Sequence, residues 1–89
     1  MQIRDIAISN RTGLHARACA KVVQIASRFR CDIWVSVRGR KASARSIVAL
    51  LLLSASVGSV ARIEIEGPDE NRAMREIVTL FDERFGERS

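Results

Sequence analysis

The chain has 89 residues, of which 47% are hydrophobic and 28% are charged, and its formal net charge at neutral pH is +5. This length fits one compact domain over residues 1–89 with a single two-layer core, and it is too short for a second domain. The longest unbroken apolar run, residues 47–53, cannot span a bilayer, and the N-terminus lacks the pattern of a secretory signal. We therefore expect a cytoplasmic protein without membrane insertion.

The N-terminal third predicts a strand followed by a helix. Apolar and polar residues alternate closely enough over residues 2–9 to indicate a half-buried strand, and the segment NRTG supplies turn residues. From about residue 15 to residue 29, apolar residues recur at three- and four-residue steps, which predicts a helix with one core face. The side chains predicted to form that face are Cys19, Val22, Val23, Ala26 and Phe29.

The middle of the chain predicts a hairpin, a short helix and a further strand. Residues 32–38 alternate, and RKASA at residues 40–44 can return as a second strand after a turn at Gly39. Ser46 then precedes an apolar segment that predicts a helix of about two turns, followed by a loop rich in serine. Residues 60–67 alternate again, which predicts the fourth strand.

The C-terminal part predicts a long helix that begins near Pro68 and stops by Gly86. The predicted element order is therefore βαββαβα. This order indicates an α+β fold, a two-layer open-faced sandwich in which three helices lie on one face of a four-stranded antiparallel sheet.

The distribution of charged residues and of cysteines limits which partners and cofactors the protein can have. Residues 1–62 contain eleven Arg or Lys and two acidic residues, whereas residues 63–89 contain four and eight. The basic part favours an acidic partner, either nucleic acid or an acidic protein surface. Cys19 and Cys31 lack the spacing of a zinc site, so we expect reduced thiols, with Cys19 packed in the core, and neither a metal nor an organic cofactor.

The only histidine, His15, lies at the predicted first turn of the first helix. A neutral imidazole is nucleophilic and can carry a phosphoryl group on a ring nitrogen. The backbone N–H groups of Ala16, Arg17 and Ala18 would form an anion site at the helix start, and the Arg17 guanidinium could add charge-assisted hydrogen bonds. An exposed histidine or a helix cap without chemistry is the alternative reading.

No residue set supports hydrolytic catalysis. The sequence offers neither a second histidine nor a Ser-His-Asp arrangement nor paired carboxylates. A single nucleophile beside an anion-binding turn fits a carrier that accepts and donates a group better than a self-sufficient enzyme.

The segment GLHARACAK, residues 13–21, resembles the active-site signature of the HPr family, the histidine-containing phosphocarrier proteins of the bacterial phosphotransferase system. ARSIVALLLLSASVGS at residues 44–59 resembles the second signature of the family, and residues 65–81 resemble its closing strand and helix. The resemblance covers essentially the whole chain. SIVALLLLSAS and LFDERFGE look more like the nitrogen-branch, NPr-like proteobacterial members than like the sugar branch.

This resemblance implies that His15 accepts a phosphoryl group on its δ nitrogen from phosphorylated Enzyme I and passes it to an Enzyme IIA component. The sequence leaves the oligomeric state open, and we take a monomer as the default. The resemblance implies that Arg17 steadies the phosphoryl group and that Ser46 is the serine modified by HPr kinase/phosphorylase in many bacteria. It also implies that the short apolar helix docks partners through Ile47, Val48, Leu51 and Leu52.

Two positions qualify this picture. Ala18 stands where many family members have proline; alanine keeps the helix and adds one N–H donor, so we expect function to survive with altered local rigidity. Ser46 also fits a plain N-cap without regulation.

The short apolar helix itself has two readings. An 89-residue domain cannot bury every face of such a helix, which predicts an exposed patch beside His15. Complete burial of the helix in the core is the alternative.

Two other functions remain open. One is a basic nucleic-acid binding module, although the chain has no tyrosine and lacks an RNP motif for base stacking. The other is a regulatory HPr paralogue that binds partners without phosphoryl transfer, against which the presence of His15 and Arg17 argues.

Overall fold

A computed structural model describes residues 1–88 of the chain. Its elements are β1 (Gln2–Ala7), α1 (Ala16–Arg28), β2 (Asp32–Val37), β3 (Arg40–Ser43), α2 (Ile47–Leu52), β4 (Val60–Glu66) and α3 (Glu70–Asp82), followed by a 3₁₀ turn, Arg84–Gly86. The strands and helices thus follow the predicted order, and their boundaries lie within four residues of those expected.

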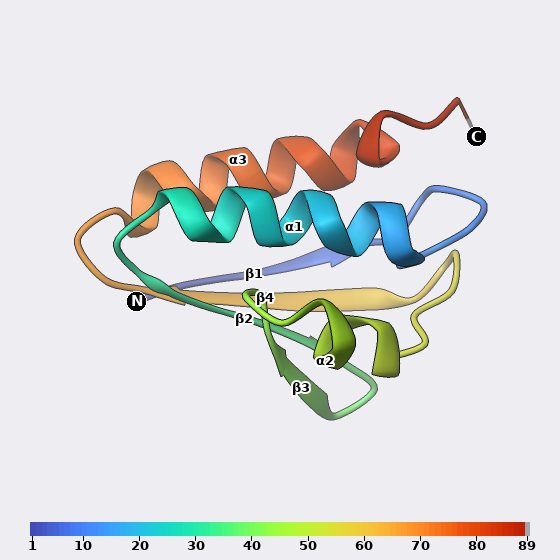
Figure 1. Ribbon diagram of the computed structural model, residues 1–89, viewed down its shortest axis with the longest axis horizontal. Coiled ribbons are helices and arrows are strands. Elements are labelled where there is room, and N and C mark those ends of the chain that lie inside the picture. The colour runs from blue at the N-terminus through green and yellow to red at the C-terminus, as the bar shows by residue number, and fades with distance from the viewer. Residues whose placement is uncertain (89) are drawn as a thin grey trace.

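The four strands form one antiparallel sheet in the order β1-β4-β2-β3. The central strand β4 pairs with both β1 and β2, so that Ile63 faces Arg4 on one side and Val35 on the other. Figure 1 shows α1 and α3 running side by side along the sheet, with the shorter α2 near β3. The α+β open-faced sandwich that the sequence predicted is confirmed.

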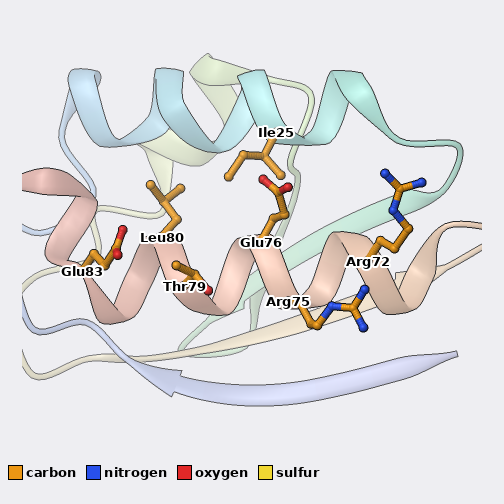
Figure 2. Close-up of a pocket in the computed structure, with 7 residues that line it drawn as sticks. All are labelled: Ile25, Arg72, Arg75, Glu76, Thr79, Leu80 and Glu83. Atoms are coloured by element: carbon orange, nitrogen blue, oxygen red, sulfur yellow. The ribbon is translucent and has the colours of Figure 1, made fainter.

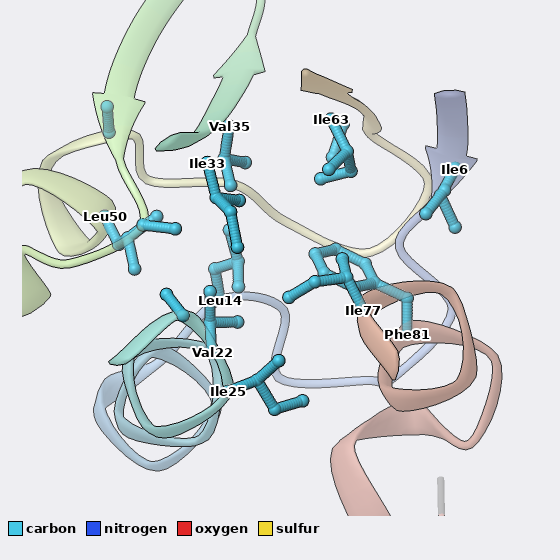
Figure 3. Packing of buried hydrophobic residues seen from close by; sticks show 14 of the residues in the cluster. Ile6, Leu14, Val22, Ile25, Ile33, Val35, Leu50, Ile63, Ile77 and Phe81 are labelled. Atoms are coloured by element: carbon cyan, nitrogen blue, oxygen red, sulfur yellow. The ribbon is translucent and has the colours of Figure 1, made fainter. Parts of the chain in front are cut away.

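The core lies between the sheet and the helices. Alternate residues of β2 and β4 are buried while their neighbours are more exposed, as expected for strands with one covered face. Figure 3 shows side chains from α1, α2 and α3 packing against these strands. The core residues labelled there are Ile6, Leu14, Val22, Ile25, Ile33, Val35, Leu50, Ile63, Ile77 and Phe81.

Strand β1 departs most from its predicted pattern. The strand ends at Ala7, and Ile3 is 54% exposed, whereas Ile6 and Ile8 are buried. Successive side chains of a strand point to opposite faces, so Ile3 lies on the face opposite to Ile6 and cannot share the core with it. Val23 of α1 is likewise only partly buried at the edge of the core.

Both cysteines are buried and free. Burial raises the pKa of the Cys19 thiol, and burial is also the main cause that raises the pKa of Cys31. The predicted packing role of Cys19 is confirmed. Within residues 1–88, no group of three His, Cys, Asp or Glu side chains is placed to hold a metal, and no helix has the length and hydrophobicity needed to cross a membrane.

One arginine ties the end of α1 to the start of α2. The Nη2 group of Arg45 donates to the carbonyl oxygens of Phe29 at 3.1 Å and Cys31 at 3.0 Å. The last carbonyls of a helix lack partners within the helix, and a cation there also complements the helix dipole. Arg45, next to the cap of α2, therefore also fixes where α2 sits relative to α1.

Candidate functional site at the start of helix α1

His15 is the N-cap of α1. Its backbone is extended, with φ −86° and ψ −179°, and the Arg17 N–H donates to its Nδ1 atom at 3.3 Å. The first regular helical bond runs from the Cys19 N–H to the His15 carbonyl at 2.9 Å. The N–H groups of Ala16, Arg17 and Ala18 precede that bond and point toward the positive end of the helix dipole. The structure thus brings together the backbone groups that the sequence predicted as an anion site.

The turn before His15 requires a glycine. Gly13 has φ +66°, a region that residues with a side chain rarely adopt, and a Cβ atom there would lie 2.2 Å from the Ala55 carbonyl oxygen. The next residue, Leu14, is buried and donates its N–H to that same oxygen at 2.9 Å. The turn before His15 therefore packs against the loop that follows α2, and this packing fixes the position of His15.

Glu87 is the site residue that the sequence analysis missed. Its Oε2 atom pairs with His15 Nε2, while its Oε1 atom accepts hydrogen bonds from the Thr12 hydroxyl at 2.7 Å and from Asn10 Nδ2 at 3.2 Å. The hydrogen bond with His15, followed by that with Thr12, lowers the pKa of Glu87 from 4.5 to about 2. No periodicity or motif links residues 72 positions apart, so the sequence carried no signal for this pair.

These contacts distinguish the two nitrogens of the imidazole. An ionised carboxylate only accepts hydrogen bonds, so Nε2 of His15 carries the proton that faces Glu87. Nδ1 accepts from a backbone N–H and therefore presents a lone pair. When the imidazole is neutral, these hydrogen bonds favour the tautomer with its proton on Nε2 and its lone pair on Nδ1, at the N-terminus of α1.

The surroundings of His15 are strongly basic. His15 and Glu87 border an open hollow of about 810 Å³ that is also lined by three arginines, Arg11, Arg17 and Arg88. Arg17 is exposed, so its guanidinium is free to face an anion bound in the hollow. The arrangement can bind a phosphoryl-sized anion next to a nucleophilic nitrogen.

A second groove lies on the helical layer, between α1 and α3. Its lining residues are Ile25, Arg72, Arg75, Glu76, Thr79, Leu80 and Glu83 (Figure 2). It shares no residue with the hollow beside His15. None of the residues that the sequence singled out for function lines this groove, so the hollow at His15 is the candidate site.

Ser46 caps α2 as the sequence predicted. Its hydroxyl accepts the Ala49 N–H at 3.1 Å. The residue as a whole is partly buried.

Helix α2 exposes four of its apolar side chains. Val48 and Leu52 are 67% and 65% exposed, whereas Leu50 is fully buried. We call the exposed set the α2 patch; it consists of Ile47, Val48, Leu51 and Leu52. The predicted exposure is confirmed, and complete burial of the helix is wrong. Helix α2 contacts α1, and the Ala55 carbonyl in the loop after α2 accepts a hydrogen bond from Leu14, next to His15.

Comparison of the chain with models of known protein families identifies its family. The model for the family described as the PTS HPr component phosphorylation site matches residues 3–83. The chain belongs to the HPr family. It is therefore a phosphocarrier of the phosphotransferase system rather than a catalyst, and neither nucleic-acid binding nor a purely regulatory role is favoured.

Individual HPr proteins align over nearly the full length. The phosphocarrier protein HPr of Xylella fastidiosa is 45% identical over 93% of each chain, and the phosphocarrier protein NPr of Shewanella violacea is 37% identical over 97% of this chain and 94% of its own. A crystal structure of HPr from Thermoanaerobacter tengcongensis superposes with a TM-score of 0.95 at 42% identity over the whole of both chains. Another crystal structure, titled as an HPr dimer from that organism, has a TM-score of 0.77 at 42% identity over 98% of this chain and 100% of its own. The resemblance to the NPr type is thus supported alongside a strong resemblance to HPr proteins.

Proposed function

We propose that His15 carries the phosphoryl group, on its Nδ1 atom. The observation that supports this most directly is the hydrogen-bond pattern of the ring: Nε2 is occupied by Glu87, while Nδ1 presents a lone pair at the N-terminus of α1. Helix N-termini bind anions through their free N–H groups and the positive end of the dipole. The same atom is thus both the nucleophile and the neighbour of an anion site.

In the first transfer, the Nδ1 lone pair attacks the phosphorus of phosphorylated Enzyme I. The bond between phosphorus and Enzyme I breaks, and its electron pair stays on Enzyme I, while a new P–Nδ1 bond forms and leaves a positive charge on the ring. The Arg17 N–H, which donates to Nδ1 in this structure, is released as the P–Nδ1 bond forms. It then holds the phosphoryl oxygens together with the N–H groups of Ala16 and Ala18 and the Arg17 guanidinium. No proton has to move, because Nε2 keeps its hydrogen.

In the second transfer, a nucleophile of an Enzyme IIA component attacks the same phosphorus. The P–Nδ1 bond breaks, its electron pair returns to Nδ1, and the ring becomes neutral again. The carrier therefore needs neither a cofactor nor a general base of its own. This matches a site that contains a single nucleophile.

Both partners dock on the α2 patch and the basic surface around His15. Val48 and Leu52 offer an apolar centre, and Arg11, Arg17 and Arg88 supply positive charge around the acceptor nitrogen. Such a surface suits transient encounter with an acidic protein, since charge steers association and the apolar patch provides the short-range contact. The protein would act in the cytoplasm. It would act as a monomer, and analytical ultracentrifugation at working concentration tests this oligomeric state directly.

Ser46 is the proposed site of modification by HPr kinase/phosphorylase. A phosphate there would add about two negative charges at the start of α2, next to the α2 patch. The helix start tolerates negative charge, so partner binding should change more than folding. Incubation with the kinase and ATP, followed by mass spectrometry, should show one added phosphate in the wild type and none in Ser46→Ala; an equal gain in both would reject Ser46.

The decisive experiment is phosphorylation by Enzyme I and phosphoenolpyruvate. The wild-type protein should acquire an acid-labile, base-stable phosphate, and His15→Ala should acquire none. Label that persists in His15→Ala would move the acceptor elsewhere. No label on the folded wild type with a cognate Enzyme I would reject the proposed role of His15.

A further inference from the structure

We propose that Glu87 is a positioning residue for phosphoryl transfer, which holds His15 in the Nε2–H tautomer and offsets the charge that the ring gains when Nδ1 is phosphorylated. This inference rests on the proposed role of His15. Its starting point is the pairing of the Glu87 carboxylate with His15 Nε2.

The segment that carries Glu87 is anchored in the core. Phe85 is 1% exposed, and its ring meets that of Phe81 edge-on with centroids 4.8 Å apart. Lys21 of α1 also donates its Nζ to the Phe85 carbonyl oxygen. These contacts hold Phe85, two residues before Glu87, in place. They therefore restrict where the Glu87 carboxylate can lie.

The backbone at this point adopts an uncommon conformation. Arg84 and Phe85 have φ values of 55° and 56°, in the left-handed region that costs residues with side chains about 1 kcal/mol or more. Such a conformation persists only where surrounding contacts hold it. Here it redirects the chain at the end of α3 toward the His15 turn.

The turn before His15 supplies the donors that orient the carboxylate. Thr12 and Asn10 both donate to Oε1, which leaves Oε2 for His15. Asn10 is fully buried and its Nδ2 group also donates to the Gly13 carbonyl at 2.8 Å. One set of side chains therefore shapes the turn and aims Glu87 at the ring.

The chemistry gives this contact a role in the reaction. With the proton fixed on Nε2, the lone pair is fixed on Nδ1. Formation of the P–Nδ1 bond makes the ring cationic, and part of that charge resides on the N–H that faces the carboxylate. Glu87 therefore favours both the reactive tautomer and the phosphorylated product.

The position of Glu87 limits its repulsion of the phosphoryl group. The carboxylate contacts the Nε2 edge of the imidazole, whereas the phosphoryl group would sit at the Nδ1 edge beside the start of α1. Arg11, Arg17 and Arg88 line the shared hollow and contribute opposing positive charge.

The test uses Glu87→Ala, Glu87→Gln and a matched control, Glu83→Ala, in the full-length protein. Glu83 is an acidic residue four positions earlier that lines the groove between α1 and α3 rather than the hollow at His15. ¹⁵N NMR of the His15 ring reports the tautomer, and single-turnover labelling with phosphorylated Enzyme I reports the rate.

We expect the wild type and Glu83→Ala to show the Nε2–H tautomer and equal transfer rates. Glu87→Ala keeps only the Arg17 N–H to favour a lone pair on Nδ1, so it should populate the Nδ1–H tautomer in part. It should accept the phosphoryl group about tenfold more slowly, by analogy with the loss of a partner that orients a metal-binding histidine. Glu87→Gln, whose amide oxygen can still accept from Nε2–H, should keep the tautomer and lose only about threefold, because the charge is removed but not the hydrogen bond.

An unchanged His15 tautomer in Glu87→Ala would overturn the inference, whatever the rate. A tautomer that shifts as expected in a protein whose wild-type form accepts no phosphoryl group would instead reject the proposed role of His15. The two failures are thus distinguishable.

Discussion

Helices α1 and α2 begin in the same way but are built for different tasks. Each has an extended N-cap residue whose side chain accepts a backbone N–H: His15 Nδ1 from Arg17 at 3.3 Å, and Ser46 Oγ from Ala49 at 3.1 Å. Serine is among the preferred N-caps, whereas histidine is not. Capping alone therefore accounts for Ser46 and leaves His15 unexplained.

The surroundings of the two caps supply the missing explanation. His15 has a second ring nitrogen held by Glu87 and lies in a hollow bordered by three arginines. Ser46 opens a helix whose exposed surface is apolar. The comparison teaches that one helix start is equipped to hold a charged group and the other to present a contact surface.

The largest effect on phosphoryl transfer should come from replacing His15 by another residue that can cap α1. His15→Asn keeps a side-chain acceptor at the start of α1 but removes the nucleophilic nitrogen, so phosphoryl acceptance should be abolished while stability changes by less than about 1 kcal/mol. Labelling by Enzyme I and chemical denaturation measure the two quantities. Retained acid-labile label in this variant would show that the first helix start, like the second, is only a cap.

Substitutions on the buried and exposed faces of α2 should affect different properties, namely the stability of the fold and the docking of partners. Leu50→Ala, at a fully buried position, should destabilise the fold by about 2–5 kcal/mol. Leu52→Ser, at a position 65% exposed, should change stability by less than about 0.5 kcal/mol but slow transfer from Enzyme I about fivefold through weaker docking.

Urea denaturation and the substrate dependence of transfer distinguish these two variants. The Leu52→Ser loss should disappear at saturating Enzyme I, because the reacting atoms are untouched. A loss that persists at saturation would mean that the α2 patch acts on the chemical step and not on docking.

A smaller effect is expected at the second cap. Ser46→Ala removes the acceptor for the Ala49 N–H and should destabilise the protein by about 1 kcal/mol. Phosphoryl acceptance at His15 by unmodified protein should stay within about twofold of wild type. A large loss of acceptance would contradict the division of tasks between the two helix starts.

The smallest effect concerns pH and should appear at the first helix start alone. The pKa of Glu87 is lowered from 4.5 to about 2, so its contacts contribute stability that is fully present above about pH 4.5 and lost as the pH falls toward 2. The difference in urea midpoint between wild type and Glu87→Gln should therefore shrink over that range. The Ser46→Ala difference should stay constant, because the cap has no charge.

A direct titration checks the same point. ¹³C NMR of the Glu87 carboxyl should give a midpoint near 2 in the wild type, rising toward 4.5 in His15→Ala, since His15 is the first cause of the shift. A wild-type midpoint near 4.5 would mean that the carboxylate does not rest on His15 in solution.

The amino-acid sequence by itself determined the local structure and the position of the candidate site. Hydrophobic periods of two and between three and four residues located the strands and helices, because those periods follow from backbone geometry. The small-residue turn at Gly13 and the lone His15 marked an anion-binding helix start, and Ser46 marked the second cap. The family resemblance rested on these same short segments.

Tertiary structure decided what short-range pattern cannot encode. The strand order β1-β4-β2-β3, the exposure of Ile3 and the capping of α1 by Arg45 depend on which distant segments pack together. Glu87 is the sharpest case: it is 72 residues from His15, and only the core packing of Phe85 and the left-handed turn before it bring the two side chains together. The sequence thus marked His15 as the candidate nucleophile, and the fold supplied the carboxylate that pairs with its Nε2 atom.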